Sequence, residues 1–141
     1  MAGYSGTPLA KKLGIEPGTR LFTVGAPGHY DELLAPLPEG VKRVRKIEDA
    51  DVAHFFVTAR ARLEKELRAA VPKMQQDAAI WVSWPKKSAK VATDITEDTV
   101  REVALPLGLV DIKVCAVDEI WSGLKLVIRK ALRQKPGRSR S

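Results

Sequence analysis

The sequence has little with which to cross-link itself, to hold a metal or to enter a membrane. Its 141 residues include one cysteine, Cys115, which excludes an internal disulfide and any zinc site built from several cysteines. No apolar run approaches the ~20 residues that a membrane-spanning helix needs, and the opening MAGYSGTPLAKKLG lacks the apolar segment of a secretory signal. We therefore expect a cytoplasmic protein, and the length suits one domain with its own hydrophobic core.

The motifs of common catalytic sites are also missing. There is no G-x-S-x-G nucleophile turn, no phosphate-binding Walker loop and no H-E-x-x-H zinc motif. The two histidines, His29 and His54, have no carboxylates at metal-ligand spacing, so we expect no metal site. His54 lies in an apolar segment, which favours a hydrogen-bonded core residue, and Cys115 likewise suits a core position. These absences favour a protein that is not an enzyme.

The net charge of +7 comes mainly from the C-terminal segment. Six basic residues and no acidic ones lie between Arg129 and Ser141, which leaves the rest of the chain close to neutral. Residues 131–141 are expected to form a disordered, solubilising tail, because KPGRSRS is too small and polar to fold. Alternatively, the tail binds nucleic acid through phosphate contacts without sequence specificity. The candidate contacts are Arg133, Lys135, Arg138 and Arg140.

Strand and helix patterns alternate along residues 1–130, which we expect to form a single domain. An N-terminal helical segment within residues 1–15 begins at Thr7-Pro8 and ends at Gly14. The last helix would be capped by Asp94, with Glu97 three residues later. We expect strands over residues 20–24, 41–47, 51–58, 79–84, 110–116 and 123–130, and helices over about 30–34, 59–74 and 94–104.

This order of elements predicts the fold class. Strands that alternate with helices form a mostly parallel sheet with helices on its faces. The last two strands are separated by only about five residues, too few for a parallel crossover, so they must form an antiparallel hairpin. The sequence therefore predicts a three-layer, Rossmann-like α/β fold with a sheet of about six strands.

In such a sheet, a ligand is expected at the carboxyl ends of the parallel strands. The first strand ends in GAPGHY, whose two glycines permit close backbone approach and whose following helix N-terminus favours anions, although a tight turn explains the same glycines. The fourth strand ends in WPKK, where two lysines suit a phosphate or carboxylate, or simply a solvated loop. The candidate ligand-binding residues are Gly25, Pro27, Gly28, His29, Tyr30, Glu48, Thr58, Arg60, Trp84, Lys86 and Lys87.

The tryptophans and His29 refine this prediction. Trp81 and Trp84 lie in one strand and must point to opposite faces of the sheet, so they cannot form one stacking platform. Trp121 lies in the expected hairpin connection, where it would act as a lid or an interface anchor. His29 is the candidate acid or base near neutral pH.

Five segments together resemble a family of small actinobacterial proteins: YSGTPLAKKLGI, LLAPLPEGV, WVSWPKK, TDITEDTVRE and GLVDIKVCAVDEIWSGLKLVIR. A looser resemblance joins the glycine turn, IWVSWPK and the closing WSGLKLVIR hairpin to a shortened class I methyltransferase. It implies an S-adenosylmethionine site with Gly25 and Gly28 in the cofactor loop and Glu48 at the ribose. Compared with that family, the chain lacks one strand and one helix of the core, the acidic residue of the first strand and the full glycine pattern.

Three hypotheses for function follow. The first is a non-catalytic module on a degenerate methyltransferase-like fold, which binds a small anionic ligand or a protein partner at the carboxyl edge. The second is a methyltransferase that uses S-adenosylmethionine. The third is a nucleic-acid-associated protein that acts through its basic tail.

Overall fold

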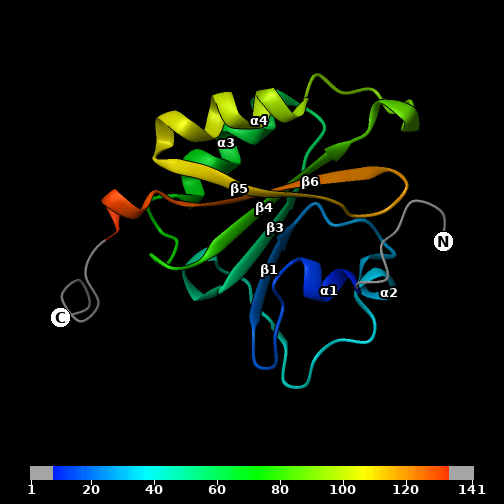
Figure 1. Cartoon of the computed structure of the whole chain (residues 1–141), viewed down its shortest axis with the longest axis vertical. Helices are drawn as coiled ribbons and strands as arrows, with labels where there is room; N and C mark the ends of the chain where they lie inside the picture. Colours follow the sequence, from blue (N-terminus) through cyan, green and yellow to red (C-terminus); the bar gives the residue numbers. More distant parts are fainter. Residues whose placement is uncertain (1–7, 134–141) are drawn as a thin grey trace.

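The protein forms one six-stranded sheet with helices on both faces (Figure 1). The structure, a computed structural model, describes residues 8–133. The helices are α1 (Leu9–Lys12), α2 (Tyr30–Leu34), α3 (Arg60–Ala70) and α4 (Glu97–Ala104), and short 3₁₀ turns are η1 (Ile47–Asp49), η2 (Lys87–Ala89), η3 (Leu105–Leu107) and η4 (Lys130–Leu132). The strands are β1 (Arg20–Val24), β2 (Lys42–Arg43), β3 (Val52–Phe56), β4 (Ala79–Pro85), β5 (Leu109–Ala116) and β6 (Trp121–Ile128).

The strand order in the sheet is β2-β1-β3-β4-β6-β5. Strands β2, β1, β3 and β4 are mutually parallel, while β6 runs antiparallel to β4 and pairs with β5 as a hairpin. This arrangement confirms the predicted mostly parallel Rossmann-like sheet with a C-terminal antiparallel hairpin.

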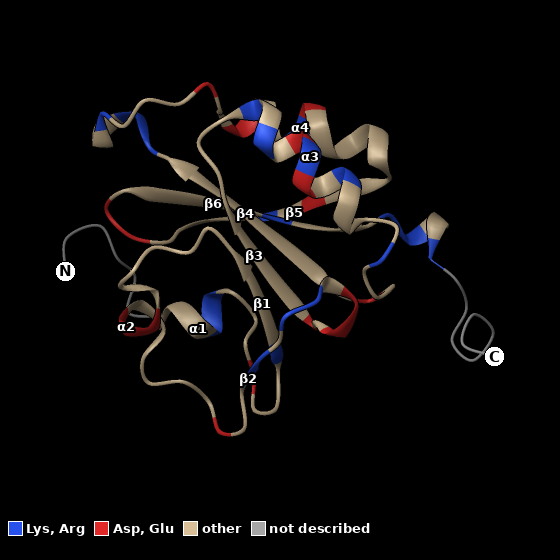
Figure 2. Ribbon diagram, turned by 180° about the vertical axis from the view of Figure 1, so that it is seen from behind, with Lys and Arg blue, Asp and Glu red and all other residues tan. Residues whose placement is uncertain are grey.

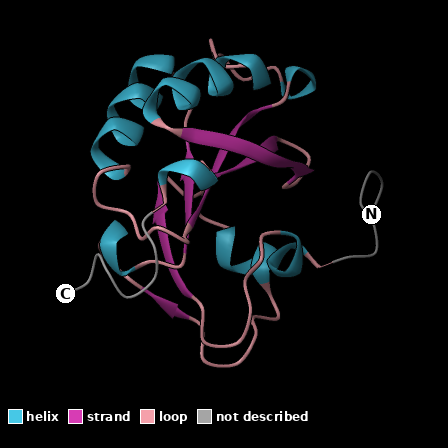
Figure 3. Cartoon of the chain, turned by 60° about the vertical axis from the view of Figure 1, so that its left-hand side comes forward, coloured by secondary structure: helices cyan, strands magenta, loops and turns pink. Residues whose placement is uncertain are grey.

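Helices α3 and α4 cover one face of the sheet, and α1 and α2 cover the other (Figures 1 and 3). Each face has its own core cluster, because alternate residues of every strand point to opposite sides. Trp84 belongs to the cluster under α3 and α4, whereas Trp81 belongs to the other and donates its indole N–H to the carbonyl of Leu13 at 3.0 Å. The predicted separation of these two tryptophans is confirmed.

The second strand is much shorter than the predicted 41–47. Only Lys42 and Arg43 pair with β1, followed by one further bond from the amide of Val44 to the carbonyl of Leu21. In this segment the apolar residues fall at every third position, whereas a strand with one buried face requires them at every second position. The strand therefore ends early, and the chain continues to the 3₁₀ turn η1. Because β2 pairs with the first residues of β1, η1 leads directly to the amino end of β3.

The start of α4 also differs from the prediction. Thr96, rather than Asp94, caps the helix: its hydroxyl accepts the amide of Thr99, and the Thr99 hydroxyl accepts the amide of Thr96. Asp94 serves another helix, since its carboxylate accepts the amide of Arg60 in the first turn of α3 at 2.7 Å. A capping box with threonine at its third position replaces the expected box with Glu97.

Two features of the hairpin were not predicted. The ladder between β5 and β6 shifts register between Asp111 and Lys113, so Ile112 sits in a β-bulge and the expected single apolar face of β5 is interrupted. As a result, Ile112 and Val114 are about half exposed. Trp121 is the first residue of β6 rather than a loop residue, and its ring packs edge-on against Phe56 at 5.0 Å between centroids, which excludes a free lid.

The described residues end inside the predicted tail. Lys130–Leu132 forms η4, and Arg133 donates from its Nε to the carbonyl of Ile128 at 2.9 Å, so this first part of the tail is folded onto the sheet. Lys135, Arg138 and Arg140 lie outside the described residues, as does the predicted helix cap Thr7. Among residues 8–133, no helix is long and apolar enough to cross a lipid bilayer.

Candidate functional site

Three loops meet where the parallel strands end, as the topology requires. The chain segment after β1 (Gly25–His29), the one after β4 and the β5–β6 hairpin turn (Val117–Ile120) lie at this carboxyl edge. A backbone bond of 2.7 Å from the amide of Lys86 to the carbonyl of Ile120 joins the end of β4 to the hairpin turn. The side chain of His29, in the segment after β1, bonds to Asp118 and so joins that segment to the hairpin turn.

Gly25 makes the sharp turn out of β1. It has a φ of +71°, which L side chains rarely adopt, and a Cβ on this residue would lie 2.7 Å from the carbonyl oxygen of Phe56. Gly28 is different, because a Cβ there would meet no atom within 4 Å. The first glycine is therefore required by the fold, and the second leaves a stretch of backbone that a ligand can approach.

His29 and Asp118 form a pair of acid–base groups at this edge. The Nε2 of His29 lies 3.1 Å from Oδ2 of Asp118; the histidine side chain is 45% exposed and the aspartate side chain 8% exposed. The other carboxylate oxygen of Asp118 accepts the amides of Ile120 and Trp121, both at 2.8 Å. The carboxylate is therefore fixed by the hairpin turn, and it orients an imidazole that solvent and ligands can reach.

A buried chain of hydrogen bonds lies behind this pair. The Tyr30 hydroxyl is 2.9 Å from Nδ1 of His54, and Nε2 of His54 is 2.7 Å from the hydroxyl of Ser83. Complete burial lowers the pKa of His54 to about 3, so this ring is neutral, and burial raises the pKa of Tyr30. His54 is thus the hydrogen-bonded core histidine that the sequence predicted. Because Tyr30 is the first residue of α2, this row of hydrogen bonds also anchors the start of that helix, next to His29.

Lys86 and Lys87 lie beside the hairpin turn and form no ion pair within residues 8–133. Lys87 is exposed and Lys86 is half-buried. They are available to an anion at the same edge as His29. Figure 2 shows this segment as a basic stretch at the end of β4.

Other predicted site residues are not available in this way. Tyr30 and Trp84 are 2% and 6% exposed and belong to the core. Arg60 is held by Glu64 at 3.1 Å and Glu102 at 2.7 Å, and the exposed Thr58 uses its carbonyl to bind Thr93. Pro27 is half-buried, and its carbonyl accepts the amide of Tyr30 at 3.0 Å.

Glu48 lies at the opposite end of the sheet. Its carbonyl accepts the side-chain amide of Gln75, which precedes the amino end of β4. The expectation that Glu48 follows the carboxyl end of a strand is wrong, because β2 stops after two residues and η1 turns toward the start of β3.

Sequence reasoning missed Asp118, the residue that orients His29. One signal for it exists: an antiparallel hairpin whose last strand pairs with β4 must place its turn at the carboxyl end of β4. An aspartate in such a turn commonly accepts the amides that follow it, as Asp118 does. Within the described residues, no cluster of three or more histidine, cysteine and acidic side chains could hold a metal ion.

Solved structures similar to this chain share a Rossmann-like, methyltransferase-like fold. Fibrillarin from Aeropyrum pernix, in complex with natively bound S-adenosyl-L-methionine, matches 84% of this chain and 73% of its own at 12% identity, with a TM-score of 0.57. Precorrin-6y C5,15-methyltransferase from Geobacter metallireducens matches 85% of each chain at 11% identity, with a TM-score of 0.54. A possible exported protein from Bordetella parapertussis gives 0.60 at 13% identity over 85% of this chain and 65% of its own.

At these identities the likeness concerns the fold alone. No family model matches the sequence, and no curated protein matches it. The resemblance to an actinobacterial family stays a prediction.

Proposed function

We propose that this chain binds S-adenosylmethionine at the carboxyl edge and transfers its methyl group to a nitrogen or oxygen nucleophile, with His29 as the proton acceptor. The observation that carries the proposal is the His29–Asp118 pair, which stands at the ligand-binding edge of a fold that in fibrillarin holds this cofactor.

The edge suits the cofactor at the glycine turn and at the acid–base pair. The open backbone at Gly28 would receive the ligand, and Lys86 lies beside the hairpin turn at the same edge. Glu48 does not contribute, since it lies at the amino ends of the strands. When bound, S-adenosylmethionine would supply an electrophilic methyl group.

The acceptor's proton is the part of the reaction that this chain's own side chains handle. Transfer would break the sulfur–methyl bond of the cofactor and release S-adenosylhomocysteine. The N–H or O–H proton of the acceptor would pass to Nδ1 of His29, because Nε2 donates its own hydrogen to the carboxylate of Asp118. Asp118 is a positioning residue: it is fixed by two amides and stabilises the imidazolium that results.

Equilibrium dialysis with labelled S-adenosylmethionine tests the binding step. We expect retention by the natural chain and by the control variant Glu48→Gln, because Glu48 is at the other end of the sheet. His29→Gln should retain the cofactor while methyl transfer falls by about 100-fold, the usual contribution of a general base. Absence of retention at millimolar cofactor would overturn the proposal.

A second candidate function is binding without catalysis, and it is favoured by the two lysines at the edge, which form no ion pair with any residue of the described range 8–133. A small anionic ligand or an acidic protein segment would contact Lys86 and Lys87. Lys86→Ala combined with Lys87→Ala should then abolish capture of that partner, whereas His29→Gln should leave it unchanged. Equal capture by all three chains would exclude this function.

A further inference from the structure

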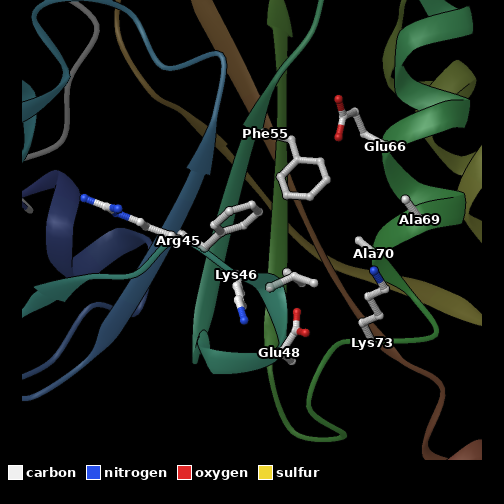
Figure 4. Close-up of a pocket in the computed structure, with 10 residues that line it drawn as sticks. Arg45, Lys46, Glu48, Phe55, Glu66, Ala69, Ala70 and Lys73 are labelled. Atoms are coloured by element: carbon white, nitrogen blue, oxygen red, sulfur yellow. The ribbon is translucent and has the colours of Figure 1, made fainter.

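A cavity lies away from the carboxyl edge, between β1, η1 and the C-terminal half of α3. Its volume is about 450 Å³, within the range of small-molecule sites. We call it the β1 groove, and Figure 4 shows the side chains around it. The lining residues are Phe22, Arg45, Lys46, Ile47, Glu48, Phe55, Glu66, Ala69, Ala70 and Lys73.

The β1 groove exists because α3 and α4 leave β1 incompletely covered. Residues of β3, β4 and β6 on this face are fully buried, whereas Phe22 and Val24 of β1 are only partly buried. Phe22 meets Phe55 edge to face, with 6.1 Å between the ring centroids. The floor of the groove therefore offers an aromatic surface to a flat ring.

The rim of the β1 groove carries more unpaired positive than negative charge. Arg45, Lys46 and Lys73 form no ion pair within residues 8–133, while Glu66 is neutralised by Arg62 at 2.7 Å. Figure 2 shows the basic run that leads into η1, and Figure 4 shows Lys73, in the turn after α3, and Glu48, in η1, beside the groove.

We propose that the β1 groove is a binding site for a nucleoside monophosphate, independent of the function proposed for the carboxyl edge. The base would lie against Phe22, and the phosphate would bind Lys46 and Lys73. The Glu48 carboxylate, which forms no ion pair within the described residues, would accept hydrogen bonds from the sugar hydroxyls or from an amino group of the base. An aromatic floor, two cations and one carboxylate around one cavity match the three parts of such a ligand.

Isothermal titration calorimetry with adenosine 5′-monophosphate tests this site, and two fragments separate its parts. Adenosine lacks the phosphate and ribose 5-phosphate lacks the ring, so we expect each to bind at least about 10-fold more weakly than the monophosphate. No binding of the monophosphate, or equal binding of ribose 5-phosphate, would overturn the proposal.

Two double variants with equal loss of charge locate the site. Lys46→Ala with Lys73→Ala should weaken the monophosphate by about 10-fold or more, whereas Lys86→Ala with Lys87→Ala should leave its affinity unchanged. The opposite result would assign the ligand to the carboxyl edge and reject the β1 groove. Phe22→Leu keeps an apolar side chain in the sheet and should weaken the monophosphate while leaving ribose 5-phosphate unaffected. Failure of the cofactor test at the carboxyl edge would not change any of these outcomes.

Discussion

At Gly25 the backbone leaves no place for a side chain, and Gly28, three residues later, leaves ample room. Gly25→Ala would combine a left-handed φ with a 2.7 Å approach to the Phe56 carbonyl. We expect this variant to lower the free energy of unfolding by about 1–3 kcal/mol. Gly28→Ala is the matched control and should change it by less than about 0.5 kcal/mol. Urea denaturation measures both, and equal effects would show that the turn tolerates a side chain.

His54 makes the stability of the fold depend on pH. Its folded pKa is about 3, while an unburied histidine has 6.5, so between these values the unfolded chain binds a proton that the folded chain does not. The free energy of unfolding should be unaffected by this group above pH 6.5 and should fall as the pH decreases below it, by up to about 1.4 kcal/mol per pH unit.

His54→Gln removes this titration and keeps hydrogen-bonding groups near Tyr30 and Ser83. The variant should be less stable at neutral pH by about 1–3 kcal/mol, since part of the buried chain loses its partner. Its stability should also depend less steeply on pH than that of the natural chain. Denaturation at several pH values measures this slope, and identical slopes would contradict the role of His54.

Local patterns predict residue environments well, but they do not predict distant partners. Strand alternation was enough to separate Trp81 from Trp84, and an apolar surrounding was enough to bury His54. The bond from His29 to Asp118 spans 89 positions, so no local pattern contains it. It depends on the pairing of β6 with β4, which brings the hairpin turn to the β1 loop.

At the scale of single elements, the two helices of the α3/α4 face depend on caps from the same loop. Thr96 caps α4, and Asp94 accepts the first amide of α3. We expect Thr96→Ala to lower the free energy of unfolding by about 1 kcal/mol, because it removes one side of the capping box. Thr96→Ser is the matched control, since it keeps the hydroxyl that accepts the amide of Thr99, and an equal loss from both variants would show that the hydroxyl cap is not the cause.

The length of an element was predictable where its pattern was strict. The residues of β1, α2 and β4 agree with the expected ranges to within one position, since alternation, prolines and glycines mark their ends. In contrast, the segment before η1 has no strict period, and β2 shrinks to Lys42 and Arg43. The bulge at Ile112 was also unpredictable, because an alternating sequence fits both a regular and a bulged edge strand.

At the scale of the whole molecule, the direction of the strands followed from the alternation of elements and one short connection, whereas their order in the sheet, β2-β1-β3-β4-β6-β5, was not predicted. The incomplete cover of β1 was harder to foresee. Which strand stays uncovered depends on how far α3 and α4 reach across the sheet, and they leave Phe22 partly exposed. The β1 groove, with Glu48 at its rim, is therefore a product of tertiary packing rather than of any motif.

Most of the net charge of the whole molecule lies in the C-terminal segment, where a role in nucleic-acid binding can be tested by truncation. A chain that ends at Arg133 keeps every residue of the sheet and the bond from Arg133 to Ile128, and it loses Lys135, Arg138 and Arg140 without losing any acidic residue. If these residues contact phosphates, binding to duplex DNA should weaken. The slope of log affinity against log salt should also fall by about 3, roughly 0.9 for each contact removed.

Fluorescence anisotropy with a labelled duplex at several salt concentrations measures the affinity and the slope for the full and shortened chains. Thermal unfolding should give the same midpoint for both, because Arg133 and the end of β6 are retained. The charge control is the full chain with Lys86→Ala and Lys87→Ala. It loses two positive charges that lie outside the tail, and so it shows whether any loss of positive charge weakens DNA binding. An unchanged salt slope after truncation, or a larger loss in the control, would reject nucleic-acid binding through the tail and leave it as a solubilising segment.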